Sequence, residues 1–180
     1  GNDQLDGGSG NDLIIGGPGN DTAVFSSKSN VVKLFTTKKQ NTKDGLDILI
    51  GIENVNAGSG NDKLYGNEGE DWLYGGAGDD LIDGGTGSNT GSENDRIDFR
   101  SEKSAVTVDL QAGTATGATI GNDTLLNIER VIGSDYDDKL YGSKNKYNGS
   151  HTSDLYKIIK TIKNNDSIDT TYISKINPNK

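Results

Sequence analysis

The stretch from Ala57 to Asp83 reads AGSGNDKLY, GNEGEDWLY and GGAGDDLID, which are three consecutive units of nine residues. Each unit has Gly at its fourth place, Asp at its sixth and an aliphatic residue at its eighth. The first six residues of a unit favour a tight turn, because Gly accepts the positive φ angles that such turns need. The last three residues predict a short strand, in which alternate side chains point to opposite faces. Two units then close one coil, and the eighth positions stack into an internal aliphatic ladder.

The same register continues on both sides of this stretch. An Asp followed two places later by an aliphatic residue recurs at Asp3, Asp12, Asp21, Asp47, Asp62, Asp71, Asp80, Asp95, Asp123 and Asp138. A disordered acidic chain has low hydrophobicity and high charge but no reason to keep such a register. We therefore favour an all-β repeat fold over disorder.

Stacking brings the Asp side chains together as well. Neighbouring strands lie about 4.7–4.9 Å apart, so carboxylates stacked at this spacing repel one another unless a cation lies between them. Calcium accepts the mixture of carboxylate and backbone carbonyl oxygens that a Gly-rich turn offers. The chain has no Cys and a single His, which gives a zinc or copper site little support.

These units resemble the nonapeptides of the RTX (hemolysin-type) calcium-binding repeat family, which occurs in C-terminal regions of bacterial secreted toxins, proteases, epimerases and adhesins. The resemblance implies a right-handed parallel β-roll, or β-solenoid. It also implies that each calcium ion lies between two turns, held by both sixth-place carboxylates. Carbonyls from the first and third places of one turn and the second and fourth of the next would complete the site. An extracellular, secreted or cell-surface location and type I secretion belong to the same expectation.

Carried onto this chain, the resemblance implies three principal calcium sites. The first takes Asp62 and Asp80 with the carbonyls of Ala57, Ser59, Gly76 and Gly78. The second takes Asp3 and Asp21 with the carbonyls of Gly17 and Gly19. The third takes Asp71, Gly66 and Glu68 together with Gly85, Gly87 and Asn89 of the next turn. Asp95 keeps the register, and we expect weaker binding at Asp12 and Asp138, which have no acidic partner 18 residues away.

Four further acids have two interpretations. Asp47 and Asp123 either bind metal or cap turns through their own backbone. Glu53 and Glu129 recur in the sequences Ile-Glu-Asn-Val and Ile-Glu-Arg-Val, and we favour a solvated edge charge over metal ligation for them.

The composition suits a long, thin core rather than a globular one, since the chain has 26 Gly and only 30% hydrophobic residues. We expect RTX repeats at 1–25 and 57–99, β spacers at 26–56 and 100–132, a degenerate repeat end at 133–149 and a tail at 150–180. The spacers are interpreted as wider rungs of the same roll, with a small inserted β-sandwich as the alternative. In the tail, Leu155, Ile158, Ile159 and Ile162 follow helical spacing, which predicts a short helix at about 153–165.

Charge and residue types limit the functions. The formal net charge of −9 argues against nucleic acid, whose phosphates need Lys and Arg. No apolar run of about 20 residues predicts a transmembrane segment. Carboxylates packed in metal-binding turns offer no assignable acid and base, so we predict no enzyme. Three function classes remain: a calcium-binding folding and export module, a glycan- or surface-binding adhesin using outward aromatics such as Trp72 and Tyr74, and an accessory part of an extracellular enzyme.

Overall fold

The computed structural model describes residues 1–26, 28–85 and 95–142, and the backbone of 161–164 and 167–170. Every regular element among these residues is a strand. The expectation of an all-β chain is therefore confirmed for the described residues.

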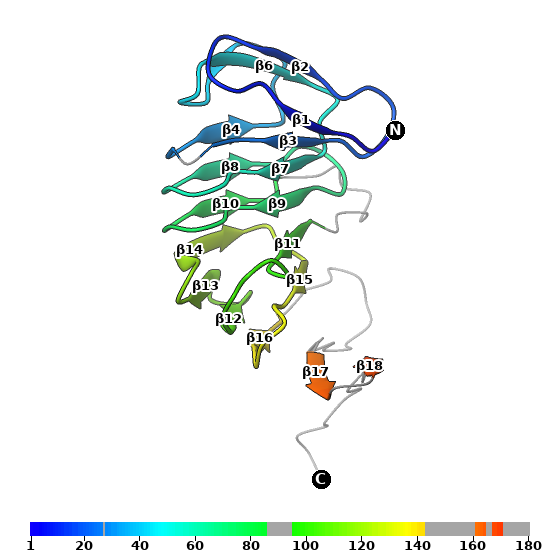
Figure 1. Cartoon of the computed structure of the whole chain (residues 1–180), viewed down its shortest axis with the longest axis vertical. Coiled ribbons are helices and arrows are strands. Elements are labelled where there is room, and N and C mark those ends of the chain that lie inside the picture. Colours follow the sequence, from blue (N-terminus) through cyan, green and yellow to red (C-terminus); the bar gives the residue numbers. More distant parts are fainter. Residues whose placement is uncertain (27, 86–94, 143–160, 165–166, 171–180) are drawn as a thin grey trace, which may run out of the picture.

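Two large sheets carry the repeats (Figure 1). The six-stranded sheet has the order β1 (Gln4–Asp6), β3 (Thr22–Val24), β7 (Asn54–Asn56), β9 (Trp72–Tyr74), β11 (Arg96–Asp98) and β15 (Arg130–Ile132). The seven-stranded sheet has the order β16 (Lys139–Tyr141), β12 (Val106–Asp109), β13 (Thr114–Gly117), β14 (Gly121–Leu126), β10 (Leu81–Asp83), β8 (Lys63–Tyr65) and β4 (Val31–Lys33). Successive repeat strands alternate between the two sheets, because β8 and β10 lie in one sheet and β9 in the other.

A third sheet lies at the end of the molecule that holds the N-terminal strands (Figure 1). It has the order β2 (Leu13–Ile15), β6 (Leu46–Ile50) and β5 (Gln40–Asn41). Strand β2 pairs parallel with β6, whereas β5 and β6 are antiparallel. The second spacer contains a similar antiparallel element, formed by β12, β13 and β14.

Parallel pairing in register builds the aliphatic ladders. Leu64 lies beside Ile82, and Leu73 lies beside Ile97. These four side chains are at most 1% exposed. The eighth-place residues that are buried in the core are Ile14, Ala23, Leu49, Leu64, Leu73, Ile82, Ile97 and Leu125, and Leu5 and Leu140 pack against it. A three-residue strand thus contributes one inward side chain, which explains how so few hydrophobic residues form a continuous core.

The predicted tail helix at about 153–165 is wrong at its C-terminal end. Thr161–Asn164 form β17, which pairs antiparallel with β18 (Ser167–Thr170). Thr161 and Ile162 are β-branched residues, which favour strands, and β18 supplies a nearby partner with Ile168 and Thr170. The rest of the predicted helix, 153–160 and 165, lies outside the described residues.

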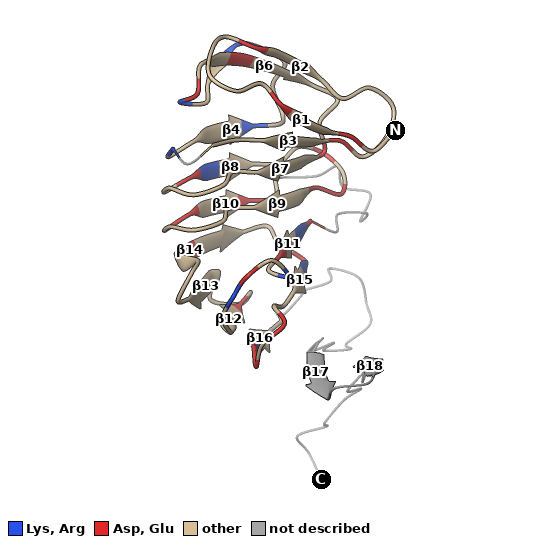
Figure 2. Cartoon of the chain, viewed as in Figure 1, with Lys and Arg blue, Asp and Glu red and all other residues tan. Residues whose placement is uncertain are grey.

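Acidic residues gather on the turns that precede these strands, along the sides of the two large sheets (Figure 2). Each turn delivers its last residue to the start of a strand, so the parallel register that stacks the aliphatic residues also stacks the acids.

Candidate metal centre

The first stack of acids lies beside the seven-stranded sheet. The backbone N–H of Asp62 donates to Oδ1 of Asp80 at 2.8 Å, across 18 residues of sequence. The N–H of Asp80 donates in the same way to Oδ1 of Asp123 at 3.1 Å. The N–H of Asn30 donates to Oδ1 of Asp62. The predicted neighbours Asp62 and Asp80 are therefore brought together, and Asp123 and Asn30 extend their stack at either end.

The second stack lies beside the six-stranded sheet. The N–H of Asp3 donates to Oδ1 of Asp21 at 2.8 Å, which brings together the second predicted pair. The N–H of Asp71 donates to Oδ1 of Asp95 at 2.9 Å. Among the described residues, the neighbour of Asp71 is thus Asp95, which lies 24 residues later in the sequence instead of the expected 18. Gly87 and Asn89 lie outside the described residues.

Glu53 and Glu129 take Asp positions in the second stack. Oε2 of Glu53 accepts the N–H of Asp21 at 2.9 Å, and Oε2 of Glu129 accepts the N–H of Asp95 at 3.1 Å. These contacts differ from the solvated edge charges favoured above. The signal was present in the sequence, because each Glu also precedes an aliphatic residue, Val55 or Val131, by two places.

The remaining predicted acids lie outside the two stacks. The N–H of Asp12 donates to Oδ1 of Asp47 at 2.9 Å, a partner 35 residues away. Oδ1 of Asp138 accepts the N–H of Val106 at 2.9 Å and the hydroxyl of Ser134 at 2.6 Å. Both acids therefore stack on another segment, although neither has the 18-residue partner of a regular repeat.

The stacked acids are deeply buried, and their negative charges need a compensating cation, proton or hydrogen-bond donor. Asp21, Asp62, Asp71 and Asp80 are at most 3% exposed, and each has a buried carboxylate oxygen without a hydrogen-bond partner among the described residues. Burial raises the pKa of Asp62, Asp71 and Asp80 to about 6, and that of Asp123 to about 8. Burying an ionised carboxylate without a partner costs several kcal/mol, roughly. The geometry therefore calls for a bound cation or for protons.

Backbone carbonyls of the turn at 57–62 lie close to the turn at 75–80, and the carbonyl of Gly58 accepts the N–H of Ala77 there at 3.2 Å. The turns stack so closely that a Cβ on Gly76 would lie 1.8 Å from the oxygen of Gly58, and one on Gly78 would lie 1.9 Å from that of Gly60. Both later residues must be Gly for this approach. The second- and fourth-place carbonyls of the first turn thus point toward the second turn.

This arrangement differs from the expected ligand set, which took the first and third places of the first turn. The carbonyl of Ala57 instead accepts a hydrogen bond from the preceding turn. The carbonyl of Gly78 faces the following turn, where a Cβ on Gly121 would lie 2.5 Å from it. Successive carbonyls of an extended segment alternate in direction, and the sequence repeat does not reveal which set faces which neighbour.

The donor set fits calcium. Among the described residues, no three His, Cys, Asp or Glu side chains gather into a metal site made of side chains alone. The stacks supply two carboxylates at each step, and carbonyl oxygens must complete the coordination. Calcium takes six to eight such oxygen ligands, in flexible geometry, at about 2.3–2.6 Å.

Asn30 closes the gap between its own turn and the turn at 57–62. Its side-chain Nδ2 lies 2.7 Å from the oxygen of Lys28, 3.0 Å from that of Ala57 and 3.4 Å from that of Ser26. Asn30 is fully buried. An amide donor therefore faces the carbonyls that would otherwise be available to a cation. Among the described residues, Asp62 is the one stacked acid that borders this gap.

Comparison with protein-family models gives one match, to the RTX calcium-binding nonapeptide repeat, in four copies. The matched residues are 1–23, 56–91 and 127–145, which contain Asp3, Asp21, Asp62, Asp71 and Asp80 of the two stacks. The chain carries RTX repeats. RTX nonapeptide repeats bind calcium, which agrees with the oxygen donors that the two stacks supply. No curated protein matched the chain when their sequences were compared.

In the register of the RTX repeats, Asn30 occupies the sixth place, where the nine-residue units have Asp. Replacing Asn30 by Asp therefore tests whether its amide takes the place of an ion. Asn30→Asp is expected to make stability more dependent on calcium, because it replaces the amide donor by a second carboxylate facing Asp62. In calcium-free buffer with trimethylamine N-oxide to keep the chain folded, we expect the melting temperature to fall by several degrees, and in 10 mM calcium we expect it to recover. Differential scanning calorimetry of the variant in both buffers measures this change.

The control is Asn20→Asp, which adds the same charge at an exposed turn position. If the two variants respond equally to calcium, Asn30 does not fill a metal gap.

Proposed function

We propose that the chain is a calcium-dependent folding module of a secreted or cell-surface protein, built as a right-handed parallel β-roll. The observation that supports this most directly is the buried stack of Asp62 and Asp80, whose carboxylates each keep one oxygen without a partner. The proposed ions lie between successive turns, bound by neighbouring carboxylates of a stack and by the carbonyls that face them. Gly58 and Gly60 supply carbonyls to the ion between Asp62 and Asp80.

The proposed mechanism couples ion binding to folding. Without calcium, the stacked carboxylates repel one another, and ordering each backbone residue costs about 1–2 kcal/mol. The three-residue strands offer one core side chain each to oppose this cost. Calcium binds the folded arrangement alone, so its binding free energy adds to the free energy of folding.

This coupling would give the module a different folding state on each side of a membrane during export. Extracellular calcium modules bind at roughly 10⁻⁴–10⁻³ M, a range that cytosolic calcium does not reach. The module would therefore stay unfolded inside the cell and fold outside it, which agrees with type I secretion. Among the described residues, no helix is long and apolar enough to cross a membrane.

The spacers at 26–56 and 100–132 are proposed as parts of the same roll. Their strands β7 and β15 lie in the six-stranded sheet together with the repeat strands. Glu53 and Glu129 continue the acid stack through them, and we add both residues to the proposed calcium ligands. The described parts of the repeat segments, 1–25, 57–85, 95–99 and 133–142, then lie on one continuous structure.

The adhesin alternative loses its original support at two aromatic residues. The guanidinium carbon of Arg96 lies 3.1 Å from the centroid of the Trp72 ring, so Arg96 covers one face of that ring. The hydroxyl of Tyr74 donates to Glu102 at 2.7 Å. Both aromatic side chains therefore have partners within the protein. We propose no catalytic role for the module.

Equilibrium dialysis against labelled calcium tests the proposed function directly. We expect more than one ion per chain, with half-saturation in the submillimolar to millimolar range. A tenfold excess of magnesium should displace little calcium, because Mg²⁺ is smaller and needs near-octahedral geometry. Failure to bind calcium at 10 mM would contradict the proposal.

A further inference from the structure

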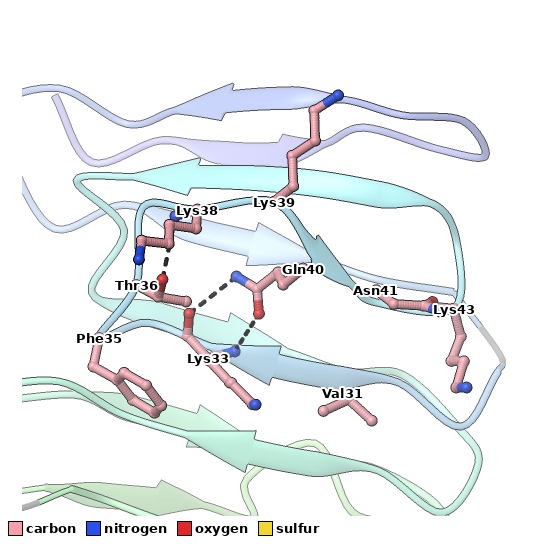
Figure 3. Close-up of a pocket in the computed structure, with 9 residues that line it drawn as sticks. All are labelled: Val31, Lys33, Phe35, Thr36, Lys38, Lys39, Gln40, Asn41 and Lys43. Carbon is pink, nitrogen blue, oxygen red and sulfur yellow. Dashed lines mark hydrogen bonds between the residues drawn. The ribbon is translucent and has the colours of Figure 1, made fainter.

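A cavity unrelated to the acid stacks lies beside β4 and β5 (Figure 3). Its volume is about 460 Å³, within the range of about 300–1,000 Å³ that is typical of small-molecule sites. The segment from Val31 to Lys43 supplies the whole lining, including the side chains of Phe35 and Gln40. One short stretch of sequence therefore forms a concave surface of its own.

The cavity is basic although the chain is acidic. Four lysines line it, Lys33, Lys38, Lys39 and Lys43, and no Asp or Glu does. None of the four is within 4.0 Å of a carboxylate in the described part of the chain, whereas nearby Lys28 pairs with Asp44 at 3.0 Å. Several of the basic residues coloured in Figure 2 fall on β4 and the loops beside it. An anionic ligand would supply the missing countercharges.

The cavity is held in shape by its own hydrogen bonds. Buried Gln40 accepts from the N–H of Lys33 at 2.8 Å and donates to its carbonyl at 3.0 Å, which fixes β4 against the returning chain (Figure 3). The hydroxyl of Thr36 accepts the N–H of Lys38 at 3.2 Å. Lys43 adopts a φ of 78°, a region uncommon for residues other than Gly, and Oδ1 of Asn41 accepts its N–H at 3.1 Å. A site ordered before binding loses less entropy when a ligand arrives.

The second spacer shows that the fold does not require a lysine at position 33. Strand β12 pairs with β16 as β4 pairs with β8, which aligns Lys33 opposite Tyr65 with Asp109 opposite Tyr141. The equivalent position in the second spacer thus carries the opposite charge. The lysine at position 33 is therefore a feature of this cavity, and the repeated β framework does not need it in order to fold.

Phe35 adds an apolar surface beside the charges. It lines the cavity, yet its side chain is 63% exposed, and burying an exposed aromatic ring against a ligand is favourable. A ligand with both an anionic group and a flat apolar face would use the lysines and the ring together. A sugar ring that carries a sulfate or carboxylate has this combination, and the concave shape suits such a unit better than a flat bilayer surface.

From these observations we propose that the β4–β5 cavity binds an anionic saccharide unit. In Figure 3 the ammonium groups of Lys33 and Lys43 lie on the same side, with Val31 between them, whereas Lys39 points away from them. Lys33 and Lys43 are therefore the expected main contacts to the anionic groups, and Phe35 the contact to the ring.

Calorimetric titration of the calcium-loaded chain with dextran sulfate oligosaccharide, and with unsulfated dextran of equal length, tests this proposal. We expect binding to the sulfated form alone. Lys33→Gln/Lys43→Asn should weaken it about tenfold, and Asn is the replacement at the second position because it tolerates a positive φ. The matched control, Lys103→Gln/Lys139→Gln, removes the same charge at exposed lysines elsewhere and should leave the affinity unchanged. Circular dichroism verifies that both variants are folded.

Three outcomes would overturn the proposal. Equal losses in the two double variants would indicate attraction by total charge rather than binding in the cavity. Tighter binding to vesicles of anionic phospholipid than to the oligosaccharide would indicate a membrane contact. An unchanged affinity in Phe35→Ala, with inorganic sulfate binding as tightly as the oligosaccharide, would indicate a site for an anion without a sugar.

Discussion

Withdrawing calcium is expected to unfold the repeat region, and returning calcium should restore its β structure. The buried oxygens of Asp21, Asp62, Asp71 and Asp80 have no partner within the described protein, so they depend on bound cations. An ion at 100 times its dissociation constant contributes about 2.7 kcal/mol to stability. Several such ions match the total stability of a typical domain, about 5–15 kcal/mol. Far-ultraviolet circular dichroism during a calcium titration of chelator-treated protein follows the transition.

Magnesium provides the control for this titration. At equal concentration and ionic strength, it should restore little β structure, because screening by salt cannot replace ions bound inside the stack. A spectrum that stays the same in chelator and in calcium would contradict calcium-coupled folding.

Protons should replace calcium in part, since they neutralise the same carboxylates. In the calcium-free fold the pKa of Asp62, Asp71 and Asp80 is about 6, above the unfolded value of about 3.9. The folded state then binds more protons, so this contribution to stability is complete below about pH 4 and is lost as the pH rises through 6. For Asp123 the loss extends to about pH 8. With trimethylamine N-oxide present to keep the calcium-free chain folded, its melting temperature should therefore fall between pH 5.5 and 8.5, and a rise would contradict this account.

The sequence predicts the acid and aliphatic positions well because both depend on short-range spacing. An Asp two places before an aliphatic residue lies at the start of a strand, and the aliphatic residue points inward. Leu64 and Ile82 are fully buried, and Asp62 and Asp80 stack beside them. The same spacing also marks Glu53 and Glu129, for which a solvated edge charge was the favoured interpretation.

Partners across unequal turns could not be read from the repeat. Asp80 stacks on Asp123 across 43 residues, and Asp71 stacks on Asp95 across 24. These pairs depend on where an inserted segment returns to the sheet, which is set by the three-dimensional path of the chain. The direction of each carbonyl and the insertion of the Asn30 amide depend on the stacking of whole turns, so a single unit does not determine them.

Replacing Asp80 by Asn is expected to reverse its effect on stability between calcium-loaded and calcium-free protein. Asp80 stands between Asp62 and Asp123, so the change removes a carboxylate from two adjacent gaps. In 10 mM calcium we expect a loss of about 1–3 kcal/mol for each site lost, given dissociation constants of about 10⁻⁴–10⁻³ M. Without calcium the neutral amide removes a buried charge while its oxygen can still accept the N–H of Asp62. The variant should then be more stable than the parent.

Asp79→Asn is the matched control, because it removes the same charge one residue earlier. Asp79 is exposed, and its Oδ1 accepts the N–H of Asn122 at 2.8 Å, which an Asn oxygen can also do. Urea unfolding in 10 mM calcium, and in calcium-free buffer with trimethylamine N-oxide to keep the chain folded, compares the three proteins. Only Asp80→Asn should change sign between the two buffers. If both variants lose the same stability in calcium and neither gains any without it, the cost arises from general surface charge, and Asp80 does not hold an ion between the turns.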